Sequence, residues 1–246
     1  MGQGYAPGKV ILVGEHFVVH GTPAIALPIA QRGIRVSVEA QPGSRWSMPE
    51  ESAAHLRMLL DALQVDADAL HIDLESTLPV GAGLGGSAAI AVALVRALDS
   101  SGSMTHEAVR TMAHGLEKLA HGNPSGIDDA VAAYACPVWY RKGEGVRVLS
   151  DISVPSLWIG LSVERTSTRD AVAGVAQLAA SRPSWFAGLV STAEENVALA
   201  LEALKAQHWK ALGGLMSHSH QLLQSLEVST PALDALVGAA LDAGAY

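Results

Sequence analysis

The stretch Leu78-Pro-Val-Gly-Ala-Gly-Leu-Gly-Gly-Ser-Ala-Ala89 places four glycines directly before an uncharged run of alanine, valine, isoleucine and leucine. Glycine allows a positive φ and lets main-chain N–H groups approach a ligand closely. A helix that begins straight after such a loop adds free N–H groups and the positive end of its dipole. We therefore predict an anion-binding loop that leads into a helix over Ser87–Leu98, capped by Ser87. A flexible surface turn is the alternative.

Two well-known phosphate-binding motifs fit this loop only in part. Gly81, Gly83 and Gly86 match the pattern GxGxxG, but Asp99 follows the helix without the second strand that a dinucleotide-binding fold requires. The glycine spacing also fits a Walker A loop, yet Ser87 stands where that motif has lysine. A phosphate bound here therefore needs a cation from elsewhere in the chain.

The composition indicates a folded protein. The chain has 246 residues, of which 49% are hydrophobic and 16% charged, and this balance excludes intrinsic disorder. The net charge of −8 argues against a dedicated nucleic-acid surface. A single cysteine, Cys136, cannot form an internal disulfide and suits a reducing compartment.

Two apolar segments bear on targeting and membrane insertion. The first charged residue, Lys9, precedes an apolar run of only Val10–Val13, which is too short for a secretory signal. Ser76–Val95 is uncharged and long enough to span a bilayer, but its glycines and Pro79 favour a loop followed by a shorter helix. We expect a soluble, cytoplasmic protein with no membrane partner.

Hydrophobic patterning predicts an α/β first domain over residues 1–152 and a mostly helical second domain over residues 153–246. Strands are expected over Tyr5–Val13, Ala24–Leu27, Ile34–Ala40, Leu70–Leu74, Val138–Arg141, Val146–Leu149 and Leu157–Val163. Helices are expected over His55–Gln64, Ser87–Leu98, Met104–Leu119, Ile127–Ala135, Arg169–Ala180, Ser184–Ala206, Trp209–Leu223 and Pro231–Ala243.

One helix carries possible metal ligands. His114, Glu117 and His121 have the spacing i, i+3, i+7, which suits a site of two histidines and one carboxylate. The HExxH pattern of zinc hydrolases is absent, because Arg110 stands at the second histidine position after His106-Glu107. Zinc is therefore the lesser alternative to a solvated polar face. Glu117 alone, near a phosphate loop, suits Mg²⁺.

Three segments together resemble the GHMP kinases, and within them the mevalonate kinase family. They are APGKVILVGEHFVVHG at residues 6–21, the glycine loop, and HGNPSGIDD at residues 121–129. The resemblance covers residues 4–180 well and the remaining helices loosely. It implies an α/β (α+β) GHMP kinase fold with a ribosomal-protein-S5-like first domain. That domain includes a left-handed βαβ crossover, and the site lies between it and a mostly helical second domain.

The resemblance also implies an activity and roles for individual residues. The expected reaction is ATP-dependent phosphorylation of mevalonate at its 5-hydroxyl, a step of isoprenoid biosynthesis, with Mg²⁺ as cofactor. Lys9 and Asp128 correspond to the catalytic pair, and Ser87 and Glu117 to the Mg²⁺ ligands. The ATP phosphate loop corresponds to Pro79, Gly81, Gly83, Leu84, Gly85, Gly86 and Ser87.

The resemblance places mevalonate beside three further residues. Glu15 and His16 correspond to the substrate pocket, and Thr168 to a threonine that faces the active site. The expected partners are these small molecules and a second copy of the chain in a homodimer. Phosphomevalonate kinase, another GHMP small-molecule kinase, a non-catalytic ATP or metabolite sensor and, more distantly, a metal hydrolase are the alternatives.

The chain departs from the family pattern at several points. Gly86 stands where the family has a serine, and Asp129 stands where it has asparagine, which adds a negative charge beside Asp128. The region 41–55, where the family places part of its adenine pocket, looks short. A third, glycine-rich motif does not occur, so we expect this sequence to lack the C-terminal end of such an enzyme.

Overall fold

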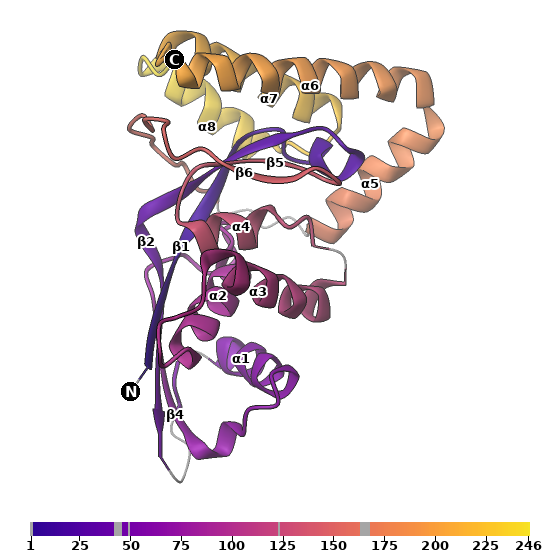
Figure 1. Ribbon diagram of the computed structural model, residues 1–246. Helices are drawn as coiled ribbons and strands as arrows, with labels where there is room; N and C mark the ends of the chain where they lie inside the picture. Colours follow the sequence, from indigo (N-terminus) through magenta and orange to yellow (C-terminus); the bar gives the residue numbers. More distant parts are fainter. Residues whose placement is uncertain (1, 42–45, 49, 123, 163–167) are drawn as a thin grey trace. The chain divides into compact units, whose positions relative to one another are not determined.

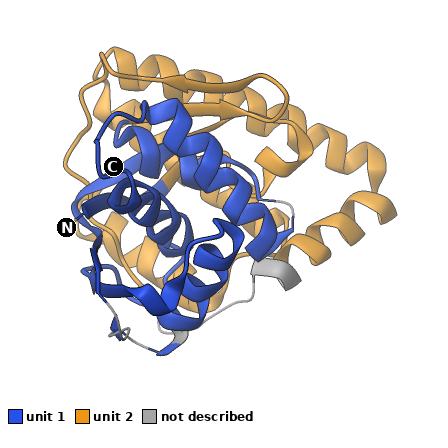
Figure 2. Ribbon diagram, turned by 60° about the horizontal axis from the view of Figure 1, so that its bottom comes forward, with its two compact units in different colours: residues 1–10, 27–136 blue, residues 11–26, 137–246 orange. Residues whose placement is uncertain are grey.

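The computed structural model describes residues 2–41, 46–48, 50–122, 124–162 and 168–246 (Figure 1). The chain divides into two compact units, one of residues 1–10 and 27–136 and the other of residues 11–26 and 137–246 (Figure 2). The units interleave along the sequence, because strands β1 (Gly2–Val13) and β2 (Ala24–Ala40) contribute residues to both. The predicted division after residue 152 stays a prediction.

The sheet of the first unit is built on the second half of β2. Ile34–Ala40 pair antiparallel with β4 (Leu70–Ser76), and the short strand β3 (Trp46–Ser47) lies parallel to β4. The register places Val36 opposite Leu74 and Val38 opposite Ile72. Residues directly opposite each other in an antiparallel pair share a face, and these four side chains are all buried in the core of this unit.

Four helices complete the first unit: α1 (Glu50–Ala62), α2 (Gly86–Leu98), α3 (His106–His121) and α4 (Ile127–Tyr134). A 3₁₀ turn, η2 (Ala67–Ala69), precedes β4. Helix α2 packs against the other three helices, and its small, apolar side chains are buried almost all round. The α/β character predicted for the first part of the chain is therefore confirmed.

The long uncharged stretch of the sequence divides as predicted. It supplies the end of β4, then the glycine loop, then α2, which has only 13 residues. A helix that crosses a bilayer needs about 20 apolar residues. Across the part of the chain that the structure describes, no helix combines the length and the apolarity needed to cross a membrane.

The second unit is mostly helical, as predicted for the later part of the chain. It contains the 3₁₀ turn η1 (Phe17–His20) and the hairpin of β5 (Val138–Arg141) and β6 (Gly145–Val148), in which β5 also pairs with Ala24–Ala26 of β2. Its helices are α5 (Thr168–Ser181), α6 (Pro183–Lys205), α7 (Trp209–Ser225) and α8 (Pro231–Asp242).

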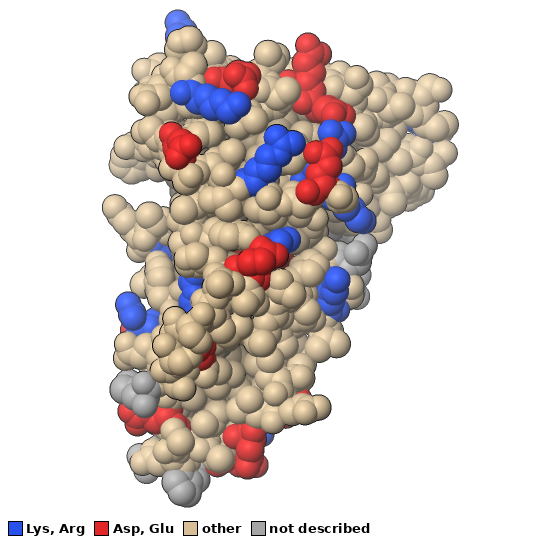
Figure 3. Space-filling model, viewed as in Figure 1, with Lys and Arg blue, Asp and Glu red and all other residues tan. Residues whose placement is uncertain are grey.

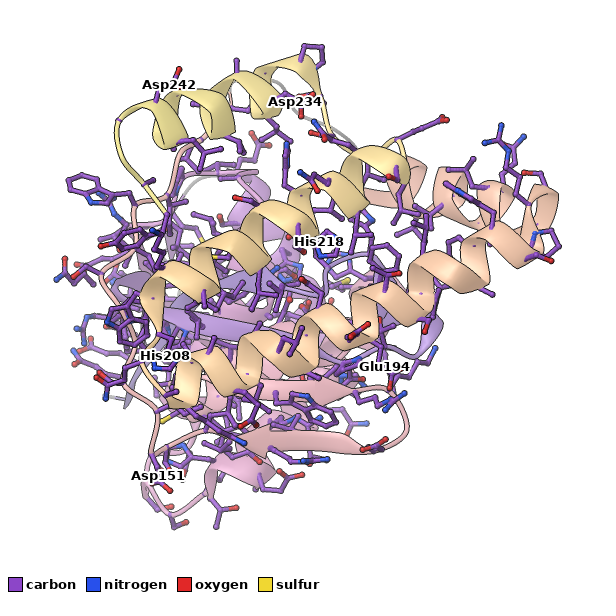
Figure 4. The ribbon with its side chains drawn as sticks, turned by 90° about the horizontal axis from the view of Figure 1, so that it is seen from above. Asp151, Glu194, His208, His218, Asp234 and Asp242 are labelled. Atoms are coloured by element: carbon purple, nitrogen blue, oxygen red, sulfur yellow. The ribbon has the colours of Figure 1, made fainter. Side chains whose placement is uncertain are left out.

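Helices α6 and α7 of the second unit are joined by a buried amide as well as by apolar packing. Asn196 of α6 donates to the carbonyl oxygen of Leu215 at 3.1 Å, and its Oδ1 lies 3.1 Å from His218 Nδ1 of α7. Figure 4 labels His218 on α7, with Glu194 on α6 and Asp234 on α8. Because Asn196 is only 3% exposed, these bonds satisfy polar atoms that would otherwise be costly to bury.

One strand prediction is wrong, and two other predicted strands join into a single strand. Residues 157–162 of the predicted strand Leu157–Val163 have no regular structure, and residue 163 lies outside the described residues. Their alternating pattern has no described partner strand, and Trp158 is fully exposed. The predicted strands Ala24–Leu27 and Ile34–Ala40 are one strand, β2. The pairing of β2 with β5 ends at Ala26, and the pairing of β2 with β4 begins at Ile34. Pro28 lies between the two pairings and interrupts neither of them.

Charged side chains of both signs are interspersed on the face of the molecule that Figure 3 shows. In the second unit Arg141 of β5 contacts Glu194 of α6 at 2.9 Å and also donates to the carbonyl oxygen of Gly21. Acidic residues are thus partly neutralised by close basic neighbours. The expectation that nucleic acid is not a partner stays a prediction.

The contact of β1 with α2 gives a test of the fold. A side chain at Gly4 would place its Cβ 1.9 Å from the Ala93 carbonyl oxygen, so Gly4→Ala should destabilise the chain by roughly 1–3 kcal/mol. Gly115→Ala is the matched control, because this α3 glycine has open space around it, and it should stabilise by about 0.5–1 kcal/mol. Urea denaturation measures both changes. Equal stability of the Gly4→Ala variant and the parent would contradict this packing.

Candidate active site

The glycine loop occupies residues 77–85, between β4 and α2. Gly81, Gly83 and Gly85 have φ values of 69°, 71° and 73°, which lie in the left-handed region that favours glycine. Helix α2 begins at Gly86, with Gly85 as its N-cap and no side-chain cap. The predicted capping role of Ser87 is therefore wrong. The first turn of α2 retains N–H groups of the kind that bind phosphate oxygens.

Lys9 of β1 forms a backbone hydrogen bond to this loop, and its side chain passes close to Gly85. Its N–H donates to the carbonyl oxygen of Leu84 at 2.9 Å. A Cβ at Gly85 would lie 2.7 Å from Lys9 Cγ, so glycine is required there by close approach as well as by its φ value. The loop thus fixes the path of the lysine side chain.

The Lys9 ammonium group is directed at a carboxylate of α4. Lys9 Nζ lies 3.2 Å from Asp128 Oδ1, and the two side chains are 13% and 38% exposed. Asp128 is in the first turn of α4, where the helix dipole favours negative charge. Its neighbour Ile127 is buried, whereas Asp128 remains partly open to solvent. The arrangement joins a fixed cation to an accessible proton acceptor beside the glycine loop.

Ser87 and Glu117 form a second polar contact in the same unit. Ser87 Oγ donates to Glu117 Oε1 at 2.7 Å, which connects the first turn of α2 to α3. Glu117 is only 5% exposed, and this burial raises the pKa of its carboxyl group. The hydrogen bond from Ser87 and the nearby His121 oppose this rise, whereas the charges of Asp128 and Asp129 add to it.

Two histidines meet the same hydroxyl group. His55 Nε2 of α1 and His121 Nε2 of α3 lie 3.2 Å and 3.0 Å from Ser87 Oγ. A hydroxyl has one proton, so when Ser87 donates it to Glu117, both histidines act as donors. Burial and then the neighbouring His121 lower the pKa of His55. No local motif in the sequence marks His55, and only the packing of α1 on α2 brings it here.

The donor set fits a magnesium ion better than zinc. A hydroxyl and a buried carboxylate beside a phosphate loop are hard oxygen ligands, which Mg²⁺ prefers. The zinc alternative does not assemble, because His114 contacts Asp129 at 3.2 Å while Glu117 and His121 face Ser87. Among the described residues, no three His, Cys, Asp or Glu side chains are grouped so as to hold a metal ion.

The residues predicted to contact the substrate belong to the second unit. Glu15 and His16 are partly buried, and His16 has a φ of 61°, an uncommon value for a residue other than glycine. Burial, followed by the charge of His20, lowers the pKa of His16. Thr168 is the first residue of α5, and its side chain lies outside the described part of the structure. Their roles stay predictions.

Comparisons with known proteins find relatives that match nearly the whole chain. Residues 51–136 match the family model described as the GHMP kinases N terminal domain. The chain is 33% identical to the mevalonate kinase of Thermococcus sibiricus, over 98% of this chain and 82% of the relative. It is also 33% identical to that of Methanothermobacter thermautotrophicus, over 98% and 83%.

Solved structures show the same likeness. The crystal structure of L. major mevalonate kinase in complex with R-mevalonate matches with a TM-score of 0.82 and 28% identity, covering 99% of this chain and 81% of that one. The mevalonate kinase of methicillin-resistant Staphylococcus aureus matches with a TM-score of 0.71 and 27% identity, covering 99% and 83%.

The buried Glu117 predicts a pH-dependent stability. Its pKa is raised in the folded chain, so its stabilising contribution is present below the unfolded pKa and is lost as pH rises through the folded pKa. Glu117→Gln should therefore raise the free energy of unfolding at pH 7 in metal-free buffer. That gain should shrink toward about pH 4, where the unfolded carboxyl is itself protonated.

The matched control is Glu75→Gln on β4, because Glu75 is exposed. It should change stability little at either pH, since a solvated carboxylate loses no hydration on folding. Urea denaturation of both variants at the two pH values gives the comparison. A Glu117→Gln variant less stable than the parent at pH 7 would show that the carboxylate is stabilised by its neighbours, contrary to this account.

Proposed function

The chain belongs to the mevalonate kinase family, and we propose that it transfers the γ-phosphoryl group of ATP to the 5-hydroxyl of mevalonate, a step of isoprenoid biosynthesis. The observation that carries this proposal is the pair Lys9–Asp128, 3.2 Å apart, with Lys9 attached to the glycine loop. A protein that only senses ATP has no need of a proton acceptor beside the phosphate loop.

Phosphoryl transfer requires positioning and charge neutralisation more than a strong base, because its transition state is largely dissociative. In the proposed role, Asp128 orients the alcohol and accepts its proton late in the transfer. Lys9 stabilises the negative charge on the moving phosphoryl group, and so supplies part of what a Walker A lysine supplies elsewhere. The side chain of Lys9 is only 13% exposed, which strengthens this interaction.

The glycine loop and the Ser87–Glu117 pair would hold the rest of the nucleotide. Backbone N–H groups of residues 81–87 would bind phosphate oxygens, aided by the dipole of α2. Ser87 and Glu117 would hold Mg²⁺, which neutralises charge on the β- and γ-phosphates when bound. His55 and His121 lie against the Ser87 hydroxyl, and a bound Mg²⁺ would take the place of at least one of their hydrogen bonds to its oxygen.

The remaining parts of the proposal rest on the family resemblance. Glu15, His16 and Thr168 would bind mevalonate, whose carboxylate and hydroxyl groups need polar partners. The homodimer and the cytoplasmic location expected from the sequence are likewise proposals.

The proposed reaction is tested by incubating the chain with ATP, Mg²⁺ and one acceptor at a time, followed by ³¹P NMR of the products. The acceptors are mevalonate, phosphomevalonate, galactose and homoserine. A new phosphate monoester with mevalonate, and far slower turnover of the other three, supports the proposal. A pyrophosphate product from phosphomevalonate would favour the sibling kinase. ATP binding without turnover of any acceptor would favour a sensor.

The catalytic pair gives a direct prediction. Asp128→Asn and Lys9→Met should each lower kcat at least about a hundredfold, the scale expected of a positioned acid–base group, while ATP binding changes much less. Asp68→Asn and Lys118→Met are controls, because both residues are exposed. Steady-state kinetics and nucleotide titration measure the effects. Near-normal kcat in the Asp128→Asn variant would remove Asp128 from the catalytic role.

The proposed Mg²⁺ ligands give a second prediction. Ser87→Ala removes one oxygen ligand, so the Mg²⁺ concentration that gives half-maximal turnover should rise severalfold. The same shift should appear in the Mg²⁺-dependent binding of a non-hydrolysable ATP analogue, which needs no turnover. Ser101→Ala, in the exposed loop before α3, is the control. A Ser87→Ala variant with an unchanged Mg²⁺ titration would make Ser87 a purely structural residue.

A further inference from the structure

Asp129 is a buried carboxylate that the proposed reaction does not use. It follows Asp128 in the first turn of α4, and it is only 1% exposed. An isolated carboxylate is costly to bury, so a buried one needs a paired or hydrogen-bonded partner. Its surroundings therefore show what holds it in place.

Both partners of Asp129 come from one face of α3. His114 Nδ1 lies 3.2 Å from Asp129 Oδ1, and Arg110 Nε lies 3.5 Å from Asp129 Oδ2. Arg110 and His114 are four residues apart, so they occupy neighbouring positions on the helix surface. Neither Arg110 Nε nor Asp129 Oδ2 forms a hydrogen bond with any described residue, so this contact is an ion pair without a hydrogen bond. Each oxygen of the Asp129 carboxylate thus contacts a different residue of α3.

This contact bears on Asp128 through the geometry of the helix. Successive residues of an α-helix point about 100° apart, so fixing Asp129 toward α3 also fixes the direction of the Asp128 side chain. The N-cap of α4, Gly126, has no side chain with which to hold the first turn, and its φ is 88°. Ser125 Oγ accepts from the Ile127 N–H at 3.4 Å, and the contact of Asp129 with His114 and Arg110 is a second contact that orients this turn, toward α3.

We propose that Asp129 is a positioning residue, which His114 and Arg110 hold against α3 so that the Asp128 carboxylate stays directed at Lys9. The proposal rests on the proposed function, since it concerns the acceptor that Asp128 orients. Asp129 itself touches neither substrate nor nucleotide in this account. Its effect is on the placement of its neighbour.

The test compares Asp129→Ala with Asp129→Asn. The alanine variant loses both contacts, and kcat should fall about ten- to a hundredfold, as expected when a reacting group is displaced by about 1 Å. The KM for ATP should stay within about twofold of the parent value. The asparagine variant keeps an oxygen that can accept from His114, so it should recover most of kcat.

Two further variants keep the test decisive. His114→Ala breaks the same contact from the α3 side, so it should reproduce the loss of kcat with unchanged KM even if Asp129→Ala fails to fold. His106→Ala is the matched control, because His106 Nδ1 lies 2.9 Å from the carbonyl oxygen of Ala133 and joins the same two helices at the other end of α4. It should leave kcat unchanged.

Hydrogen exchange separates this proposal from the proposed function, because it needs no substrate. Amides of residues 127–131 should exchange faster in the His114→Ala variant and should be unchanged in the His106→Ala variant. Failure of the unaltered chain to phosphorylate mevalonate would overturn the proposed function and leave this anchoring result intact. Unchanged exchange in the His114→Ala variant would overturn the positioning role of Asp129. So would kcat values of the Asp129→Ala and His114→Ala variants that are no lower than that of His106→Ala.

Discussion

The close approach of the glycine loop to β1 is the constraint on which the site depends. The backbone of Leu84 accepts from the Lys9 N–H, and Gly85 leaves room for the Lys9 side chain where a Cβ would collide with it. The same residue, Gly85, is the N-cap of α2. One short segment therefore sets the direction of the cation and the start of the helix that is expected to bind phosphate.

The site also illustrates how closely spaced carboxylates can be accommodated. Glu117, Asp128 and Asp129 lie on α3 and α4, and each has a different partner: the Ser87 hydroxyl, the Lys9 ammonium group, and the pair of Arg110 and His114. Glu117 and Asp129 are buried, whereas Asp128 is partly exposed. The carboxylate that the reaction would need is thus the one that remains accessible to a substrate.

The sequence predicted most of the first unit and much of the site, for identifiable reasons. Alternating apolar residues and the glycine cluster predicted the strands, α2 and the loop. The family resemblance singled out the pairs Lys9–Asp128 and Ser87–Glu117, and the members of each pair are in contact in the structure. The prediction that Ser87 caps α2 was wrong, because a serine at the start of a helix can also form a hydrogen bond to another helix, as Ser87 does with Glu117 of α3. The strand prediction was wrong at residues 157–162, because an alternating pattern of apolar residues does not by itself supply a strand to pair with. His55 was missed because it reaches Ser87 only through tertiary packing.

The central claim is that Lys9 and Asp128 act as one unit in phosphoryl transfer, and a double-mutant cycle on kcat tests it most directly. The measurement compares Lys9→Met, Asp128→Asn and the double variant with the unaltered chain, using ATP and mevalonate. Residues that act as a unit show strongly non-additive losses, so the double variant should be about as slow as the slower single variant. Losses that multiply in the double variant would show independent roles and contradict the claim.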